Sequence, residues 1–230
     1  MIALAAALLA AAPAPLSCGA VTRPGVAERG ADGVWRGRAV ALCHAVADAA
    51  GGPGAAILFH GYDSLAALRD AADDRIAFLS DAERAIAPLS GALRAGPPIA
   101  VSRQVLIVPP AAAARTPRDL AGRMICFIVG TRAEDALDAW ARRAGVPIER
   151  LAFQEPVEMR DAYDVGKCAA IALDAEEANG DTGGRALDEP LASEPIMATT
   201  PVAAGDAWHG TVAGIVARAP AVAASGGGAG

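Results

Sequence analysis

The sequence shows a regular alternation of two kinds of segment, which limits the folds that the chain can adopt. Short apolar runs of strand length are separated by stretches in which apolar residues recur at helical spacing. The first part of the chain predicts a helix over 38–50, a strand over 55–60, a helix capped by Asp63 or Ser64, and a strand over 75–80. Strands that alternate with helices are typical of a mostly parallel sheet covered by helices.

The same alternation begins again after an alanine-rich patch at 111–114, which follows a strand over 105–108. The elements expected beyond the patch are a helical turn at 116–120, strands at 124–129, 150–153 and 169–173, and helices at 132–144 and 158–165. A returning segment at 195–199 and a last helix at 206–217 follow them. The restart therefore predicts two α/β units.

The lobe boundaries follow from where the pattern restarts and returns. We expect lobe one to comprise residues 15–108 and 196–224, and lobe two to comprise residues 109–195. The glycine-rich segment 225–230 is expected to be a disordered tail. In paired α/β units, ligands bind at the carboxyl ends of the strands. Hinged lobes can also close around a small molecule.

The N-terminus predicts the compartment. Residues 2–12 are alanine, leucine and isoleucine only, and a small-x-small pattern at 12–14 follows them. This is typical of a secretory signal peptide over 1–14 and predicts a periplasmic protein, although no Lys or Arg precedes the run. The run is too short to span a bilayer, which needs ~20 residues. The alternatives are an apolar first strand and, from Pro15 to Cys18, a lipoprotein anchor.

Charge and cysteine content narrow the function classes. The net charge is −6 and no Lys/Arg stripe occurs, so we expect no nucleic-acid partner. Four cysteines in an exported chain suggest disulfides, and the residues alone leave all three pairings open. The three histidines are widely spaced, so no metal or cofactor is expected.

Several collinear segments carry a resemblance to a known family. They resemble the general L-amino-acid-binding proteins of bacterial ABC importers, which belong to extracellular solute-binding protein family 3. The matches lie between residues 16 and 210, and the chain ends before that family's C-terminal extension would begin. The matching segments are GVWRG at 33–37, VALCHAV at 40–46, TPRDLAGRMIC at 116–126, AYDVGKC at 162–168, EP at 194–195 and GDAW at 205–208.

The resemblance implies a fold, a pairing of cysteines and a function. The fold is α/β, of the periplasmic-binding-protein type II, with two α/β lobes joined by hinge strands. The implied disulfides are Cys18 with Cys43 in lobe one and Cys126 with Cys168 in lobe two. The implied function is capture of an amino acid or a similar small polar solute by a monomer that delivers it to an ABC permease or another membrane partner.

The candidate site follows from what a zwitterion needs once it is removed from water. Its ammonium needs a carboxylate, and its carboxylate needs a guanidinium and backbone N–H donors. By resemblance, Asp174 takes the ammonium, Thr131 lies at a helix start that can bind an anion, and Arg84 takes the carboxylate. Ser80 opens the stretch that leads to Arg84, and Arg132 replaces the second threonine of the family.

Each of these residues also has a purely structural interpretation. Asp174 can be a solvated strand-end carboxylate, Thr131 an ordinary helix cap, and Arg84 a surface cation paired with Glu83 or Asp81.

Departures from the family motivate two alternative functions. The family's aromatic residues before the G-x-W turn are missing from 23–29, and its Asp-x-Asp is replaced by Ala39-Val40-Ala41. One alternative is a periplasmic accessory or sensory protein without transport. The other is an enzyme, since some relatives of this fold are dehydratases; Glu155 and Glu158 are then the candidate acid and base. No hydrolase motif occurs, and we expect no enzymatic activity.

Overall fold

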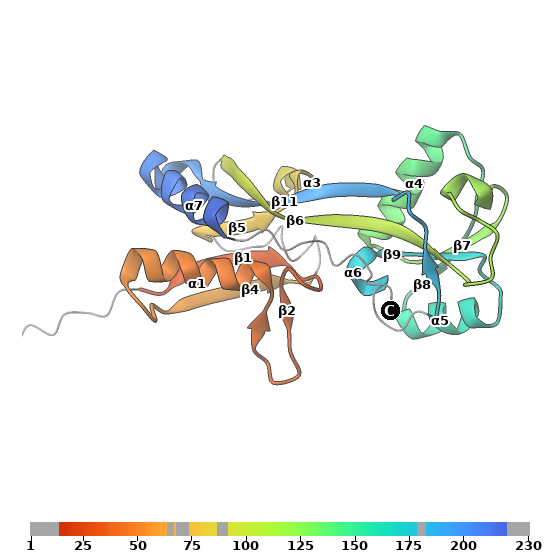
Figure 1. The fold of residues 1–230 in the computed structure, drawn as a ribbon, viewed down its shortest axis with the longest axis horizontal. Coiled ribbons are helices and arrows are strands. Elements are labelled where there is room, and N and C mark those ends of the chain that lie inside the picture. The colour runs from red at the N-terminus through yellow and green to blue at the C-terminus, as the bar shows by residue number, and fades with distance from the viewer. Residues whose placement is uncertain (1–13, 64–66, 68–73, 87–91, 179–182, 220–230) are drawn as a thin grey trace, which may run out of the picture.

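The computed structural model describes residues 14–63, 67, 74–86, 92–178 and 183–219. The hydrophobic leader at 1–13, most of the helix expected after Asp63, and the tail at 225–230 lie outside the described residues. No helix in the described ranges is long and apolar enough to cross a bilayer. Two groups of elements lie at opposite ends of two long strands, as Figure 1 shows.

A nine-stranded sheet runs through both groups in the order β4-β1-β5-β11-β6-β9-β7-β8, with β10 paired to β6. β1 pairs in parallel with β4 and β5, and β7 pairs in parallel with β8 and β9. The strands are β1 (Leu16–Val21), β4 (Ile57–Tyr62), β5 (Ile76–Leu79), β6 (Leu93–Val108), β7 (Met124–Ile128), β8 (Glu149–Phe153), β9 (Ala170–Asp174), β10 (Arg185–Ala186) and β11 (Ala192–Pro201). The predicted α/β fold with parallel strand groups is confirmed.

Two antiparallel strands connect the parallel groups. β6 pairs with β11 from Leu93↔Pro201 to Gln104↔Ala192, and then continues along β9. The sequence predicts only the last four residues of β6 as strand. The reason is that Gly96, Pro97 and Pro98 are poor strand formers, yet they belong to a long connecting strand with register shifts.

In lobe one, two helices cover the sheet, and a short, largely exposed hairpin projects from it (Figure 1). α1 (Arg38–Gly51) and α7 (Asp206–Arg218) pack on it, and the Cys18–Cys43 disulfide ties β1 to α1. A hairpin of β2 (Glu28–Arg29) and β3 (Trp35–Arg36) forms where the sequence indicates only a turn. A short helix, α3 (Asp81–Ile86), and a 3-10 turn, η2 (Val202–Ala204), complete the described part of this lobe.

In lobe two, three helices cover the sheet. They are α4 (Arg132–Ala144), α5 (Pro156–Asp164) and α6 (Ala175–Ala178), with the 3-10 turn η1 (Pro117–Leu120) beside them. The Cys126–Cys168 disulfide joins β7 to the segment after α5. Both disulfides are therefore those that the family resemblance implies.

The buried apolar clusters separate in the same way as the parallel groups. Two clusters draw on residues 18–79 and 196–216, apart from Ile99 of β6, and the other two draw on residues 105–191. Each lobe thus has its own core, as separate folding units do. Residues 105–108, which the sequence places in lobe one, pack in the clusters of lobe two.

Candidate functional site

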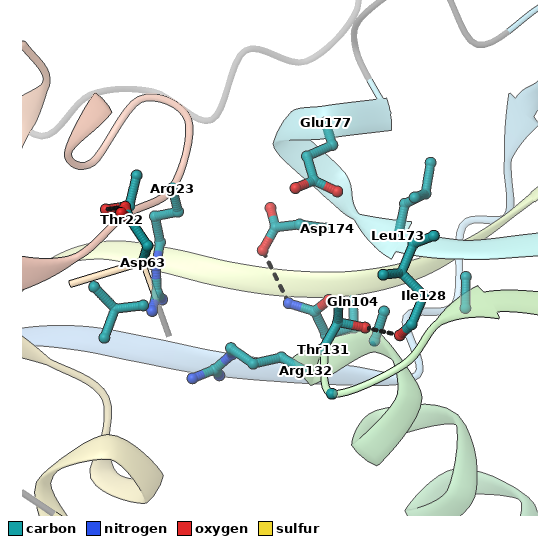
Figure 2. Close-up of a pocket in the computed structure, with 14 residues that line it drawn as sticks. Thr22, Arg23, Asp63, Gln104, Ile128, Thr131, Arg132, Leu173, Asp174 and Glu177 are labelled. Carbon is teal, nitrogen blue, oxygen red and sulfur yellow. Dashed lines mark hydrogen bonds between the residues drawn. The ribbon is translucent and has the colours of Figure 1, made fainter. Parts of the chain in front are cut away.

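A pocket of about 230 Å³ lies where the two lobes face each other. The carboxyl ends of four parallel strands meet there, since β1 leads into Thr22 and Arg23, β4 into Asp63, β7 into Gly130, and β9 ends at Asp174. Figure 2 shows the lobe-one residues on one side and the acidic residues of lobe two on the other. This is the position at which α/β sheets bind ligands.

Asp174 is held rigidly at the end of β9. Its Oδ2 accepts hydrogen bonds from Gln104 Nε2 at 2.9 Å and from Ser102 Oγ at 3.0 Å. Its Oδ1 accepts one from the backbone N–H of Glu176 at 3.0 Å. Gln104 and Ser102 are buried in the connecting strand β6. Neutral donors keep this carboxylate in place without neutralising its charge, so it can still attract a cation.

Glu177 adds a second carboxylate at the mouth of the pocket, one turn beyond Asp174. The residue as a whole remains exposed, but its carboxyl group loses hydration against the surrounding protein. That loss of hydration, with the nearby charge of Asp174, raises the pKa of Glu177 above its ordinary value. A cation placed between the two carboxylates would offset their mutual repulsion.

Thr131 lines the pocket, but its hydroxyl is occupied by helix capping. Its Oγ1 donates to the carbonyl of Ile128 at 2.7 Å and accepts from the backbone N–H of Glu134 at 3.4 Å. Glu134 in turn accepts from the N–H of Gly130 at 2.8 Å. Gly130 has a φ of 72°, which a residue with a side chain adopts only under strain. The segment thus presents the start of α4 to the pocket.

The cationic side of the pocket is Arg23, which the sequence does not single out. Its side chain is only 7% exposed, and it forms an ion pair with Glu83 Oε1. Glu83 is fully buried, and its Oε2 accepts from the backbone N–H of Ser80 at 2.8 Å. No sequence pattern marks Arg23, because it sits in an irregular loop just beyond β1.

Arg132 reaches from lobe two to lobe one and to the connecting strand. Its Nη1 donates to Glu83 Oε1 at 2.8 Å, and its Nη2 donates to Glu194 Oε2 at 2.5 Å. Burial on its own would lower the pKa of this guanidinium, but the two carboxylates raise it above its usual value. Arg132 therefore stays charged and joins the lobes through a single side chain.

Ser80 and Arg84 are not among the residues that line the pocket. Ser80 is buried, and its Oγ accepts from Arg132 Nη1 at 3.2 Å, so it supports the bridge between the lobes. The Arg84 Nη2 donates to Asp81 Oδ1 at 2.5 Å, three residues away on the same helix. This local pair is the structural interpretation that the sequence left open for Arg84.

Glu155 and Glu158, the acid and base of the enzymatic alternative, do not line the pocket either. Within the described ranges, no three His, Cys, Asp or Glu side chains are grouped closely enough to hold a metal ion.

Comparisons with solved structures identify the fold. A periplasmic binding protein of an ABC transporter from Brucella ovis with glutathione bound superposes with a TM-score of 0.65 at 23% identity; the match covers 87% of this chain and 66% of that chain. The GluR0 ligand-binding core with L-glutamate gives 0.65 at 16% identity, over 90% and 93% of the two chains. The second substrate-binding domain of a putative amino-acid ABC transporter from Streptococcus pneumoniae gives 0.64 at 13%, over 89% and 93%.

These similarities show the fold that the sequence resemblance implies, the two-lobed type II periplasmic-binding-protein fold. The chain spans about two thirds of the length of the Brucella ovis protein. Neither the protein-family models nor the curated proteins give a match to this sequence.

Proposed function

We propose that this protein is an exported solute-binding protein that captures an amino acid or a similar small polar solute for an ABC importer. The observation that carries the proposal is the pocket between the lobes, with a hydrogen-bonded but uncompensated carboxylate, Asp174, on one side and a buried guanidinium, Arg23, on the other. A zwitterion offers an ammonium to the first and a carboxylate oxygen to the second.

The size of the pocket supports a small ligand. Its volume of about 230 Å³ lies below the ~300–1,000 Å³ of pockets for drug-sized molecules. A single amino acid suits this space better than a tripeptide such as the glutathione bound by the Brucella ovis protein. The GluR0 ligand-binding core, whose ligand is one amino acid, shares the fold over nearly the whole of both chains.

In the proposed ligand set, Asp174 binds the ammonium, and Arg23 with the start of α4 at Thr131 binds the carboxylate. Arg84 and Ser80 are left out of this set, because Arg84 pairs with Asp81 and Ser80 supports Arg132. Arg132 acts by holding the lobes together around the ligand. We further propose a periplasmic location after removal of the leader at 1–14, a monomeric state, and an ABC permease as the membrane partner.

A thermal-shift screen of the purified protein against the common amino acids tests the proposal. A ligand present at 100 times its Kd raises the free energy of unfolding by ~2.7 kcal/mol. We expect at least one amino acid to raise the Tm of the wild type but not that of an Asp174→Asn variant. An unchanged Tm with every amino acid at millimolar concentration contradicts the proposal.

A further inference from the structure

The two arginines at the pocket are already neutralised by carboxylates of the chain itself. Glu83 lies between them and accepts from both Arg23 and Arg132 through the same oxygen, Oε1. Glu194 Oε2 accepts a hydrogen bond from the second amino group of Arg132, Nη2. Because Glu83 is fully buried, its charge cannot be screened by solvent and acts on the two guanidinium groups directly. Two cations and two anions thus cancel on this side of the pocket.

The remaining charges that line the pocket are all negative. They belong to Asp63, Asp174 and Glu177, and within the described ranges the lining holds no lysine or further arginine. Asp63 accepts from Thr22 Oγ1 at 2.8 Å, and Asp174 accepts from amide, hydroxyl and backbone donors, all of which are neutral. None of these contacts compensates a charge.

A neutral zwitterion compensates only part of this excess. Its ammonium pairs with Asp174, but its own carboxylate adds a further negative charge to a pocket that has an excess already. When the lobes close and water is removed, Glu177 has no cationic partner, and its buried negative charge lowers the affinity for the ligand. A ligand with a second cationic group pairs with Glu177 as well and avoids this cost.

A separate observation indicates that the ligand also carries an oxygen acceptor. Arg23 is more than nine-tenths buried and lines the pocket, and its Nη1 has no hydrogen-bond partner in the described part of the chain. A buried N–H donor left unsatisfied is costly, so a bound acceptor is favourable there. A simple diamine does not supply that acceptor, but an amino acid does.

We infer that the pocket selects basic amino acids over neutral and acidic ones, with Glu83 as the internal carboxylate that sets this preference and Glu177 as the partner of the ligand's second cation. The inference rests on the proposed function and specifies its ligand class. Glu83 acts as a specificity determinant because it occupies the guanidinium groups that would otherwise attract an acidic ligand.

Isothermal titration calorimetry with a matched ligand pair tests this inference. L-Arginine and L-citrulline have nearly the same shape, but citrulline lacks the side-chain charge. We expect the wild type to bind L-arginine roughly tenfold or more tightly than L-citrulline, the usual size of a charged hydrogen bond. L-Glutamate is expected to bind more weakly than either. In Glu177→Gln, the ratio of arginine to citrulline affinity is expected to fall to within about threefold.

Glu158→Gln is the matched control, since it removes the same charge from an exposed position on α5 of the same lobe and does not line the pocket. We expect it to keep the wild-type ratio. A ratio that survives unchanged in Glu177→Gln overturns the role assigned to Glu177. Equal or tighter binding of L-citrulline or L-glutamate by the wild type overturns the charge preference while leaving amino-acid capture intact. Absence of binding by every amino acid overturns both proposals.

Discussion

The two lobes contribute to the pocket in different ways. Lobe two supplies Asp174 and Thr131, which lie at a strand end and at a helix start, and each is fixed by contacts to nearby backbone or to β6. Lobe one supplies Arg23 and Asp63 from irregular loops. Regular elements thus place binding groups where sequence patterns predict them, whereas loops place them by packing that a single sequence does not reveal.

The lobes also differ in charge. Apart from Arg132, lobe two presents acids to the pocket, and the partners of Asp174 are neutral. Lobe one presents one acid with a neutral partner, Asp63, and a guanidinium whose charge is cancelled by Glu83. Arg132 connects these two regions, because it starts in lobe two and ends on the carboxylate of lobe one. The carboxylate that neutralises Arg23 therefore also forms the contact between the lobes.

Removing each disulfide is expected to have the largest effect on stability, and it distinguishes the two lobes. The bridges close loops of 25 residues in lobe one and 42 residues in lobe two. In the loop-entropy model these correspond to about 3.5 and about 4 kcal/mol of stability. We expect Cys18→Ser/Cys43→Ser and Cys126→Ser/Cys168→Ser each to destabilise chiefly its own lobe. Hydrogen exchange resolved by peptide measures this; equal loss of protection in both lobes contradicts two separate cores.

Substituting one residue in each lobe that the sequence assigns to the ligand tests how the lobes contribute to binding affinity. Asp174→Asn is expected to weaken amino-acid binding about a hundredfold, because a charged partner of the ammonium is lost. Arg84→Gln is expected to change the Kd by less than about twofold, since it removes an exposed local pair with Asp81. Calorimetry of both variants measures this, and the reverse order of effects would restore Arg84 to the ligand set.

The contrast between regular elements and loops also explains which parts of the fold can be predicted from the sequence. Helices α1, α4 and α7 are predictable because their apolar spacing and their ends are local features; α4, for example, is capped by Thr131 at its start and by Gly145, with a φ of 64°, at its end. Both disulfides follow once the family resemblance is used. The early part of β6 is not predictable, because its partner β11 is distant in the sequence. The β2–β3 hairpin is missed because its strands have only two residues each, between residues typical of turns.

The ion network around Glu83 is not predictable for a stronger reason. Its members, Arg23, Glu83, Arg132 and Glu194, come from four separate segments and have no common spacing. A sequence pattern can mark a charged residue at a helix start, as it does for Arg132. It cannot show that this residue reaches a buried carboxylate in the other lobe.

Substitutions at two glycines, one in each lobe, separate the stability cost of overpacking from that of backbone conformation. A Cβ at Gly19 in β1 would lie 2.1 Å from Asp74 Oδ2 and 2.7 Å from the Tyr62 ring, in a buried network where Tyr62 donates to Asp74 at 2.5 Å. Gly19→Ala is expected to cost about 2 kcal/mol through overpacking. Gly130→Ala meets open space and is expected to cost about 1 kcal/mol, because its φ is positive. Chemical denaturation measures both; a larger loss for Gly130→Ala contradicts this assignment.

The smallest expected effect is a pH-dependent stability difference at Glu177. Its pKa is raised in the folded protein, so the folded state binds the proton more tightly than the unfolded chain does. At neutral pH, the ionised carboxylate therefore destabilises the ligand-free fold slightly, and this cost disappears as the pH falls through the raised pKa. Glu177 is exposed, so solvent screens most of this cost; we expect Glu177→Gln to be ~0.3 kcal/mol more stable than wild type at pH 7 and equally stable in acid.

Denaturation of both proteins across pH measures that difference. A gap that widens as the pH falls would mean that the fold stabilises the ionised Glu177 carboxylate, which is the opposite of what its lost hydration and the charge of Asp174 predict.

A crystal structure of the protein grown with L-arginine tests amino-acid capture between the lobes most directly. The ligand's α-ammonium is predicted within ~3 Å of an Asp174 carboxylate oxygen, with its carboxylate at Arg23 Nη1 and its guanidinium facing Glu177. A ligand found on the outer surface of one lobe, or a cleft from which Arg23 and Asp174 both turn away, would contradict it.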